Sequence, residues 1–278
     1  MDGKINSIFD RMKKLLYILF LFISTALFSQ IKVISWNVEN LGKSKSDSTI
    51  TYIANTLKEY DVIALQEIVA GYGGTQAVAK LADELNRKGS KWDYVISDPT
   101  TSSAYKTERY AFLWKTSKVK KIGDAWLEKK YSLEIDREPF YCTFKYNEKS
   151  VTLVNFHAIT KSKQPETEIK YFKFLPLEYP LLNLFFIGDF NCPQSHTVFN
   201  PLKKMGYVSV FKNQKTTLKK ACKKEICLAS EFDNIWYNSS KIKVLKFDVI
   251  HFYKDFNSLK EAGEVSDHIP IWVEISLN

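Results

Sequence analysis

The stretch Ile31-Lys32-Val33-Ile34-Ser35-Trp36-Asn37-Val38-Glu39-Asn40 begins as a hydrophobic run and becomes polar from Asn37 onward. Three later motifs also combine a carboxylate with an amide or a histidine beside a hydrophobic run: Leu65-Gln66-Glu67, Gly188-Asp189-Phe190-Asn191 and Ser266-Asp267-His268-Ile269-Pro270. Short hydrophobic runs predict buried strands, and strand ends are where a sheet protein gathers distant side chains into one site. The four motifs in this order predict a metal-assisted phosphodiesterase.

The composition is that of a folded, strand-rich protein. The chain has 278 residues, of which 45% are hydrophobic and 14% aromatic, enough for one large core. Since no repeat, low-complexity tract or linker divides the sequence, we expect one domain over residues 31–278, although the length alone would allow two. The formal net charge of +9 suits a polyanionic substrate or an anionic surface, but proteins that bind no nucleic acid carry similar charges.

Residues 1–30 have the pattern of a secretory signal peptide. Arg11, Lys13 and Lys14 precede the apolar run Leu15–Phe28, and Ser29-Gln30 follow it. The run is shorter than the roughly 20 residues that span a bilayer, so an uncleaved anchor is the first alternative and a buried core segment the second. The sequence therefore predicts export to the periplasm or the medium, with no stable membrane association after cleavage.

Four cysteines would then meet oxidising surroundings, in which they can pair. Cys222 and Cys227 bracket a short lysine-rich loop and form the predicted disulfide. Cys142 ends an apolar run and is equally compatible with a buried free thiol. A pairing of Cys192 with a cysteine of the 222–227 loop stays open.

The hydrophobic pattern predicts many strands and a few amphipathic helices. Helices are expected near residues 47–57, 77–85, 166–175 and 197–205, the third of them ending at Pro176, and strands near 31–36, 62–65, 94–97, 109–115, 119–127, 139–146, 151–156, 182–187, 207, 235–237, 242–249 and 269–275. This arrangement favours two packed sheets covered on the outside by helices.

Phosphodiester hydrolysis requires charge neutralisation on the transition state, an activated water and a stabilised leaving oxygen. A hard divalent ion with a few oxygen ligands suits the first task. Glu67 and Asn37 offer a carboxylate and an amide oxygen at early strand ends and are the predicted ligands; the alternatives are a surface carboxylate and a turn residue. Mg²⁺ is the predicted ion, with Mn²⁺ as a substitute and a role for Ca²⁺ left open.

Eight short motifs of this chain closely resemble those of the endonuclease/exonuclease/phosphatase superfamily, and most of all its pancreatic deoxyribonuclease branch. They are Ile34-Ser35-Trp36-Asn37, Leu65-Gln66-Glu67, Glu108-Arg109-Tyr110, Arg137-Glu138-Pro139, Asn155-Phe156-His157-Ala158, Gly188-Asp189-Phe190-Asn191, Asp233-Asn234-Ile235 and Ser266-Asp267-His268. The resemblance extends from about residue 31 to the end of the chain. It implies an α/β four-layer sandwich, two packed mainly antiparallel sheets flanked by helices, and divalent-metal-dependent phosphodiester cleavage.

The resemblance also implies that His157 and His268 are the catalytic histidines, oriented by Glu108 and Asp233 respectively. A carboxylate that accepts a hydrogen bond from one imidazole nitrogen fixes the tautomer and raises the basicity of the other nitrogen. The remaining histidines, His196 and His251, fall outside the motifs.

Five further roles follow from the same resemblance. Asp189 would orient or deprotonate the attacking water, Asn191 would donate to the scissile phosphate, and Asp267 would hold the metal or position His268. Arg137 would contact a substrate phosphate, the alternative being a surface salt bridge. Tyr105 would face the substrate groove, although its spacing to Glu108 is one residue longer than the family pattern.

We therefore expect an exported, monomeric, Mg²⁺-dependent endonuclease that binds DNA through its phosphate backbone with little sequence specificity, RNA remaining an alternative substrate. A phosphomonoesterase or phospholipase of the same superfamily is the rival enzyme, and a non-catalytic binding module on the same scaffold is the rival without turnover. The lysine-rich stretch Lys212–Lys224 is either a solvated loop or a phosphate-contacting flap.

Overall fold

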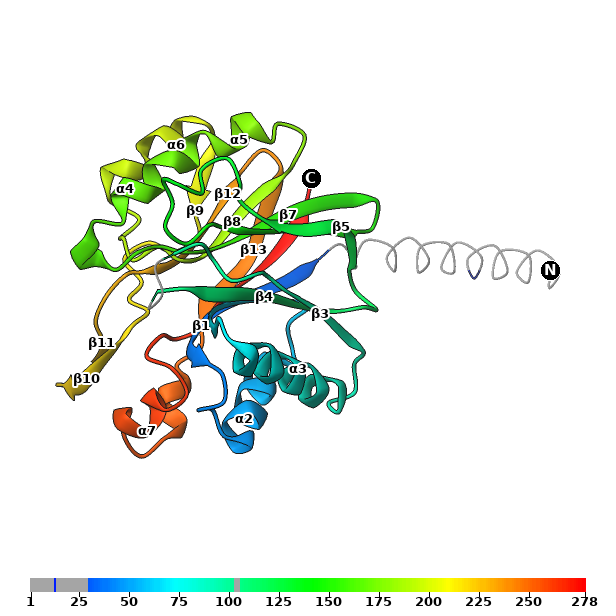
Figure 1. Cartoon of the computed structure of the whole chain (residues 1–278). Helices are drawn as coiled ribbons and strands as arrows, with labels where there is room; N and C mark the ends of the chain where they lie inside the picture. The colour runs from blue at the N-terminus through cyan, green and yellow to red at the C-terminus, as the bar shows by residue number, and fades with distance from the viewer. Residues whose placement is uncertain (1–12, 14–29, 103–105) are drawn as a thin grey trace, which may run out of the picture. The chain divides into compact units, whose positions relative to one another are not determined.

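Two six-stranded sheets contain most of the hydrophobic runs of the sequence, and their arrangement is drawn in Figure 1. The computed structural model describes Lys13, residues 30–102 and residues 106–278. Ile31–Asn278 form one compact unit. The predicted signal peptide lies outside the described residues except for Lys13 and Gln30, and Tyr105 lies outside them as well. In the described ranges, no helix combines the length and the apolar character needed to cross a bilayer.

The first sheet has the strand order β13-β14-β1-β2-β4-β3. Its strands are β1 (Ile31–Leu41), β2 (Val62–Val69), β3 (Trp92–Ile96), β4 (Glu108–Lys115), β13 (Ile242–Val249) and β14 (Ile271–Leu277). β1 and β2 run parallel, and every other neighbouring pair of this sheet is antiparallel.

The second sheet repeats this plan with the order β5-β6-β7-β8-β12-β9. Its strands are β5 (Lys120–Leu127), β6 (Phe140–Tyr146), β7 (Lys149–His157), β8 (Leu184–Asp189), β9 (Tyr207–Ser209) and β12 (Asp233–Asn238). Again one neighbouring pair, β7 and β8, is parallel and the others are antiparallel. A separate hairpin consists of β10 (Leu218–Lys223) and β11 (Ile226–Leu228).

Helices cover the outer face of each sheet and complete the predicted four-layer sandwich (Figure 1). α2 (Asp47–Leu57) and α3 (Tyr72–Asn86) cover the first sheet, and α4 (Glu166–Ile169), α5 (Leu175–Glu178) and α6 (Asn200–Lys204) cover the second. α7 (Leu259–Gly263) precedes β14, and the described residues also contain four 3₁₀ turns, namely η1 (Lys161–Lys163), η2 (Lys170–Lys173), η3 (Thr197–Phe199) and η4 (Phe252–Asp255).

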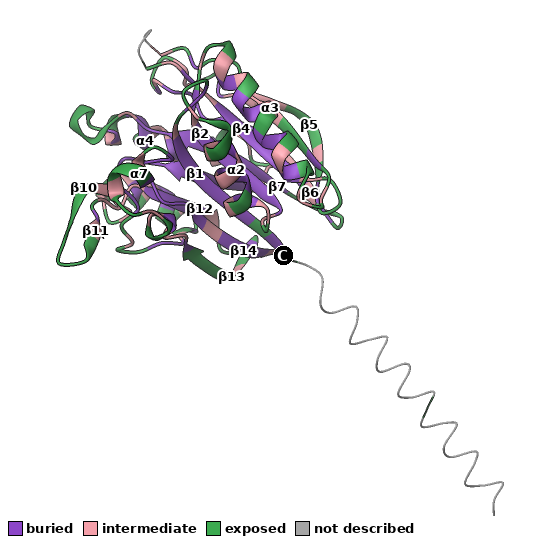
Figure 2. Ribbon diagram, turned by 90° about the horizontal axis from the view of Figure 1, so that it is seen from below, coloured by how far each residue is buried: buried purple, intermediate pink, exposed green. Residues whose placement is uncertain are grey.

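Aromatic side chains fill the space between the two sheets. Phe112 of β4 stacks on Phe140 of β6 with 5.6 Å between ring centroids, and it meets Phe144 edge-on. A second apolar cluster lies outside the second sheet, where Phe156 of β7 contacts Phe172 of η2 at 4.6 Å. Figure 2 shows the result, with buried strands in the centre of the molecule and exposed residues on the helices and the β10–β11 hairpin.

Local chemistry explains where the elements depart from the sequence prediction. The sequence favoured Asp47 or Ser48 as the N-cap of the first helix, but the N-cap of α2 is Ser46, whose hydroxyl accepts from the Thr49 N–H at 3.1 Å. The predicted helix over 166–175 is divided into α4 and η2. Pro176 does not end a helix but stands in the first turn of α5, where its missing N–H is not needed.

The four cysteines form one disulfide and leave two free thiols. Cys222 and Cys227 form the predicted disulfide, whereas Cys142 and Cys192 are buried free thiols, so the alternative pairing of Cys192 is wrong. Burial raises the pKa of each free thiol to about 12. Both are therefore protonated at neutral pH and act as small apolar core residues.

Candidate active site

The two parallel strand pairs end at the same edge of the sandwich. Asn37 and Glu67 lie in the second halves of β1 and β2, and His157 lies opposite Asp189 in the register of β7 and β8. β12 begins at this edge with Asp233, which pairs with Asp189. The topology therefore brings together side chains from distant parts of the chain, as the strand-end interpretation of the motifs predicted.

The sequence predicted that the first two strands end at their polar motifs. Both strands instead continue past these motifs through irregularities in the register. The register of β1 shifts between Asn37 and Leu41, and that of β2 shifts between Leu65 and Ile68. At the second shift, Glu67 has φ +57°, a left-handed conformation that non-glycine residues rarely adopt. Bulges of this kind redirect a side chain from the sheet toward a site, and Glu67 accordingly lines a cavity of about 430 Å³.

Gly188 allows the close approach of β8 to β7. Its φ is +137°, and a Cβ atom on it would lie 2.0 Å from the carbonyl oxygen of Phe156. A side chain at this position would push the strands apart. The glycine of the Gly188-Asp189-Phe190-Asn191 motif thus sets the separation between Asp189 and His157.

His268 and Asp233 form a buried pair. Asp233 Oδ2 lies 2.7 Å from His268 Nδ1, and the opposite ring nitrogen, Nε2, lies 3.6 Å from Asp189 Oδ2. The His268 carbonyl accepts from Trp36 Nε1 at 2.7 Å, which fixes the backbone of this loop to β1. Burial alone would lower the pKa of His268, but the charges of Asp233 and Asp189 hold its pKa well above the usual histidine value.

His157 and Glu108 form a second pair of the same kind. His157 Nδ1 lies 3.0 and 2.9 Å from the two Glu108 carboxylate oxygens, and its Nε2 lies 3.4 Å from Asp189 Oδ2. The Glu108 carboxylate also accepts from Arg137 Nη1 at 3.0 Å. Burial opposes protonation of His157, but the Glu108 charge outweighs it, so the pKa of His157 is raised.

Asp189 lies between the two imidazoles. Its Oδ1 accepts from the Asn191 backbone N–H at 2.8 Å, and its Oδ2 accepts from Asn37 Nδ2 at 3.3 Å. Burial would raise the pKa of Asp189, but His268, His157 and the Asn191 N–H stabilise the charged form, and its pKa is lowered. The site thus holds an ionised carboxylate beside two ring nitrogens that favour protonation.

The predicted substrate residues differ in how far the structure describes them. Arg137 is 8% exposed and lines the same cavity as Glu67, so its interpretation as a surface salt bridge is wrong. Arg137 Nη2 donates to the Ala158 carbonyl, and Asn191 Nδ2 donates to the same carbonyl at 3.0 Å. The buried Nε of Arg137 has no hydrogen-bond partner among the described residues. Tyr105 is not among those residues.

Oxygen donors suited to a hard divalent ion gather beside this centre. Glu67 Oε1 accepts from Asn37 Nδ2 at 2.9 Å, so Asn37 presents its amide nitrogen here and would offer its oxygen after a half-turn of the amide. Asp267 lies next to His268 and its side chain is 57% exposed. A carboxylate, an amide and a second carboxylate form a donor set of the type that Mg²⁺ prefers, so these residues fit such an ion.

A second set of atoms could also hold a metal ion. One ligand atom each of Asp189, Asp233 and His268 lies within 4.8 Å of the others. An ion bound there would compete with the 2.7 Å contact between Asp233 and His268. The Glu67 side of the site can bind an ion while both carboxylate–histidine pairs stay intact.

Sequence reasoning missed two charged residues near these donors. Glu39 has a raised pKa because it is partly buried and faces the negative charges of Asp267 and Glu67. Lys45 Nζ donates to the carbonyl oxygens of Glu264 and Val265, both at 2.9 Å. Glu39 stands two residues after Asn37 and could have been chosen from the motif, whereas the partners of Lys45 lie more than 200 positions away.

The sequence matches a family model and is similar to known deoxyribonucleases. The model of the Endonuclease/Exonuclease/phosphatase family matches residues 34–268. A deoxyribonuclease from Thioalkalivibrio sp. (strain K90mix) is 25% identical over 92% of this chain and 74% of its own length. Deoxyribonuclease-1 from Mus musculus is 29% identical over 60% of this chain and 62% of its own length.

Solved structures support the fold. An endonuclease/exonuclease/phosphatase family protein from Bacteroides thetaiotaomicron superimposes with a TM-score of 0.65 and 18% identity, over 90% of this chain and 98% of that one. A mannosyl-6-phosphatase from the same species reaches a TM-score of 0.61 with 18% identity, over 88% of this chain and 99% of that one. Because the family match spans all of the motifs that build the site, we conclude that this chain belongs to the endonuclease/exonuclease/phosphatase family and resembles its deoxyribonucleases in sequence.

Proposed function

We propose that this protein is an exported, Mg²⁺-dependent endonuclease that hydrolyses DNA phosphodiester bonds as a monomer and with little sequence specificity. The observation that carries the proposal is the position of Asp189. Its Oδ2 atom lies 3.4 Å from His157 Nε2 and 3.6 Å from His268 Nε2, and each of these histidines is held by its own buried carboxylate.

The three groups have complementary proton affinities. Asp189 has a lowered pKa and is available to orient a water molecule and accept its proton. His157 and His268 have raised pKa values and can donate to phosphate oxygens and to the leaving oxygen. Asn191, fixed by its bonds to Asp189 and Ala158, would position the scissile phosphate.

Glu67, Asn37 and Asp267 would hold the divalent ion. When bound, such an ion supplies charge stabilisation to the phosphate oxygens in the transition state. Arg137, which lines the same cavity as Glu67 and lies against Glu108, would add a second positive charge.

Two features favour DNA over a small phosphate ester. Both sequence relatives described above are deoxyribonucleases, whereas the likeness to the mannosyl-6-phosphatase is one of fold. The chain also has a net charge of +9, which attracts an extended polyanion. We propose export on the basis of the basic and apolar segments within residues 1–30.

The test is cleavage of supercoiled plasmid by the purified protein with Mg²⁺, run beside single-stranded DNA, RNA and a sugar phosphate. We expect nicked and then linear plasmid, with no activity in Asp189→Asn purified in the same way. Phosphate release from the sugar phosphate without plasmid nicking would instead identify a phosphomonoesterase, and binding without any turnover would identify a non-catalytic module.

A further inference from the structure

The β10–β11 hairpin is built directly on the catalytic loop. Thr217, the residue before β10, forms an isolated antiparallel bridge with His268. Leu218 N–H donates to the Asp267 carbonyl at 2.7 Å, and Ile269 N–H donates to the Thr216 carbonyl at 2.8 Å. These two bonds lie on either side of His268, so the first strand of the hairpin continues a short ladder with the loop that carries it.

The residues that join the hairpin to the body also contact Asp233, the partner of His268. Thr216 is fully buried, and its hydroxyl accepts from the Asp233 N–H at 3.1 Å. The returning strand is joined to the first by the bond from Ala229 N–H to the Thr217 carbonyl at 2.8 Å. The hairpin therefore stands on both members of the Asp233–His268 pair and has a defined direction relative to them.

Beyond this base, the hairpin carries a concentrated positive charge. It contains four lysines, namely Lys219, Lys220, Lys223 and Lys224, against one acid, Glu225. None of these lysines forms an ion pair within 4 Å in the part of the chain that the structure describes. Figures 1 and 2 show the hairpin projecting from the body with most of its residues exposed.

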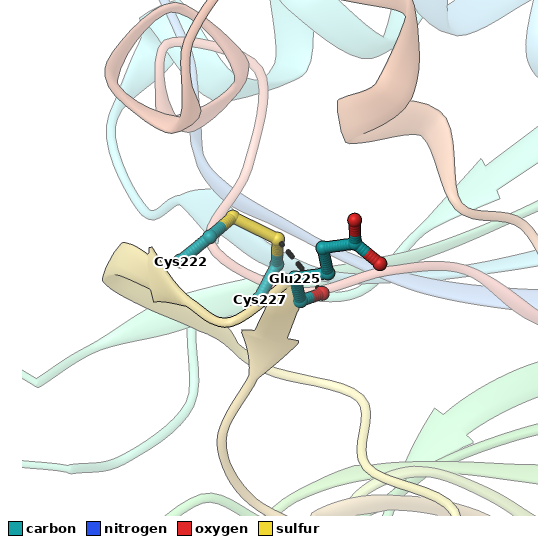
Figure 3. Close-up of a disulfide and its surroundings, with 3 residues drawn as sticks. All are labelled: Cys222, Glu225 and Cys227. Carbon is teal, nitrogen blue, oxygen red and sulfur yellow. Dashed lines mark hydrogen bonds between the residues drawn. A yellow bond between two sulfur atoms is a disulfide. The ribbon is translucent and has the colours of Figure 1, made fainter.

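A covalent bond holds this charged segment in shape. The hairpin pairs with neither main sheet, and an isolated two-stranded hairpin is marginally stable in water. Repulsion between the lysines would destabilise it further. The disulfide between Cys222 and Cys227 joins the two strands near the turn and opposes this destabilisation (Figure 3).

We propose that the β10–β11 hairpin is a basic arm that binds the phosphate backbone of a nucleic acid strand beside the bond to be cleaved. The proposal rests on the proposed function, because it names the substrate contact that would accompany cleavage at Asp189 and His268. Lysines contact phosphates as point charges and read no bases, so the arm adds affinity without sequence preference. The ladder to Asp267 and His268 fixes where the bound backbone enters the site.

The first test measures binding separately from cleavage. In an Asp189→Asn background, affinity for duplex DNA is measured by fluorescence anisotropy at several salt concentrations. Replacing Lys219, Lys220, Lys223 and Lys224 with Gln should weaken binding equally for unrelated sequences and reduce the log–log salt slope by roughly 0.9 for each phosphate that the variant no longer neutralises. The matched control replaces Lys118, Lys120, Lys241 and Lys243, which are exposed near the strand ends opposite the site, and should leave both quantities unchanged.

The second test compares a polymer with a small substrate. In the otherwise unaltered enzyme, the four-lysine replacement and Cys222→Ser/Cys227→Ser should each lower the ratio of plasmid cleavage to bis(p-nitrophenyl) phosphate cleavage by at least about tenfold, as expected when several phosphates are no longer bound. Dithiothreitol should lower this ratio in the unaltered enzyme and leave it unchanged in the double-serine variant.

The outcomes separate the two proposals. An unaltered enzyme that cleaves neither DNA nor the diester contradicts the proposed function, while the anisotropy experiment still tests the arm. An active enzyme whose arm variant retains the full salt slope and cleavage ratio overturns the arm proposal alone. The arm proposal would also be overturned if the four-lysine variant binds DNA normally but no longer binds phosphatidylserine vesicles. The arm would then contact an anionic membrane.

Discussion

Asp189 lies directly opposite His157 in the register of the parallel strands β7 and β8, with 3.4 Å between Asp189 Oδ2 and His157 Nε2. Side chains at paired positions of adjacent strands point to the same side of a sheet. The proposed water-orienting carboxylate and one proposed acid–base histidine are therefore positioned by backbone hydrogen bonds of the second sheet, in which β8 is buried along its whole length and β7 is buried from Val151 onward.

Replacing Gly188 with alanine should separate these strands. The new Cβ would lie 2.0 Å from the Phe156 carbonyl oxygen at a φ of +137°, and we expect a decrease of at least about 2 kcal/mol in the free energy of unfolding. Gly89→Ala is the control, because Gly89 also has a positive φ but open space around its Cβ position. Equal decreases in urea denaturation would show that backbone strain, and not the contact with β7, is responsible.

Removing either proposed catalytic histidine should reduce activity without unfolding the protein. His157→Ala and His268→Ala are each expected to lower plasmid cleavage by about 10²–10⁴, the range for missing acid–base assistance. His251→Ala should be nearly silent, since His251 lies outside the site. Circular dichroism checks the fold of each variant, and full activity in both site variants would exclude the proposed mechanism.

Chelation should abolish cleavage, and either Mg²⁺ or Mn²⁺ should restore it. Glu67→Gln keeps the shape of the side chain but removes its charge, so the Mg²⁺ concentration for half-maximal activity should rise by at least tenfold, about 1.4 kcal/mol of binding free energy. Glu59→Gln, at an exposed position near the opposite end of the strands, is the control. Undiminished activity in EDTA would rule out a metal requirement.

Stability of the metal-free protein should depend on pH through His157 and His268. Their pKa values in the folded protein are raised above 6.5, so folding favours their protonated forms. The resulting stabilisation is fully present below the unfolded value of about 6.5 and is lost as the pH rises through the folded values. The urea midpoint in EDTA should therefore fall as the pH rises above 6.5.

The Asp233→Asn variant should reduce this pH dependence, because it removes a charge that raises the pKa of His268. His251→Gln should not change the dependence above pH 6.5, since the pKa of His251 is lowered and its titration falls below this window. An identical decline in the Asp233 variant would contradict the assignment to this pair.

A buried amide pair beneath the site should contribute to stability. Gln66 Nε2 of β2 donates to Asn155 Oδ1 of β7 at 2.6 Å, and Asn155 Nδ2 donates to the Leu65 carbonyl at 3.0 Å, so the pair joins the two sheets. Asn155→Ala leaves buried polar groups without partners and should cost about 1–3 kcal/mol per unsatisfied group. Asn257→Ala, at an exposed position, should change the urea midpoint little.

The strands, the sandwich and the gathering of motif residues were predictable from sequence because they depend on local pattern. The hydrophobic run before Asp189 identifies a strand that ends there, and the run before Asn37 identifies a strand, although β1 continues to Leu41. The Cys222–Cys227 disulfide was predictable for a similar reason, since five positions separate the two residues. Short sequence separation limits the number of arrangements available.

Features that depend on long-range contacts could not be predicted in the same way. The bulge at Glu67 and the donor role of Asn37 Nδ2 follow from how β1, β2 and β8 meet. The β10–β11 hairpin is attached to the site through the bridge between Thr217 and His268. These two residues belong to separate segments of the sequence, and no motif links them. The hydrophobic periodicity of a segment indicates which face of a strand is apolar. It does not indicate which distant loop forms hydrogen bonds with that strand.

The last strand of the chain occupies an interior place in the first sheet. β14 lies between β13 and β1, and Trp36 Nε1 near the beginning of the domain donates to the carbonyl of His268 just before β14. When residues 1–240 have left the ribosome, His268, the histidine that Asp233 orients, has not yet been released. The other site residues are already outside: Asn37, Glu67, Glu108, His157, Asp189 and Asp233. Assembly of the complete residue set must therefore wait until His268 has left the ribosome, and a product truncated before His268 carries no complete site.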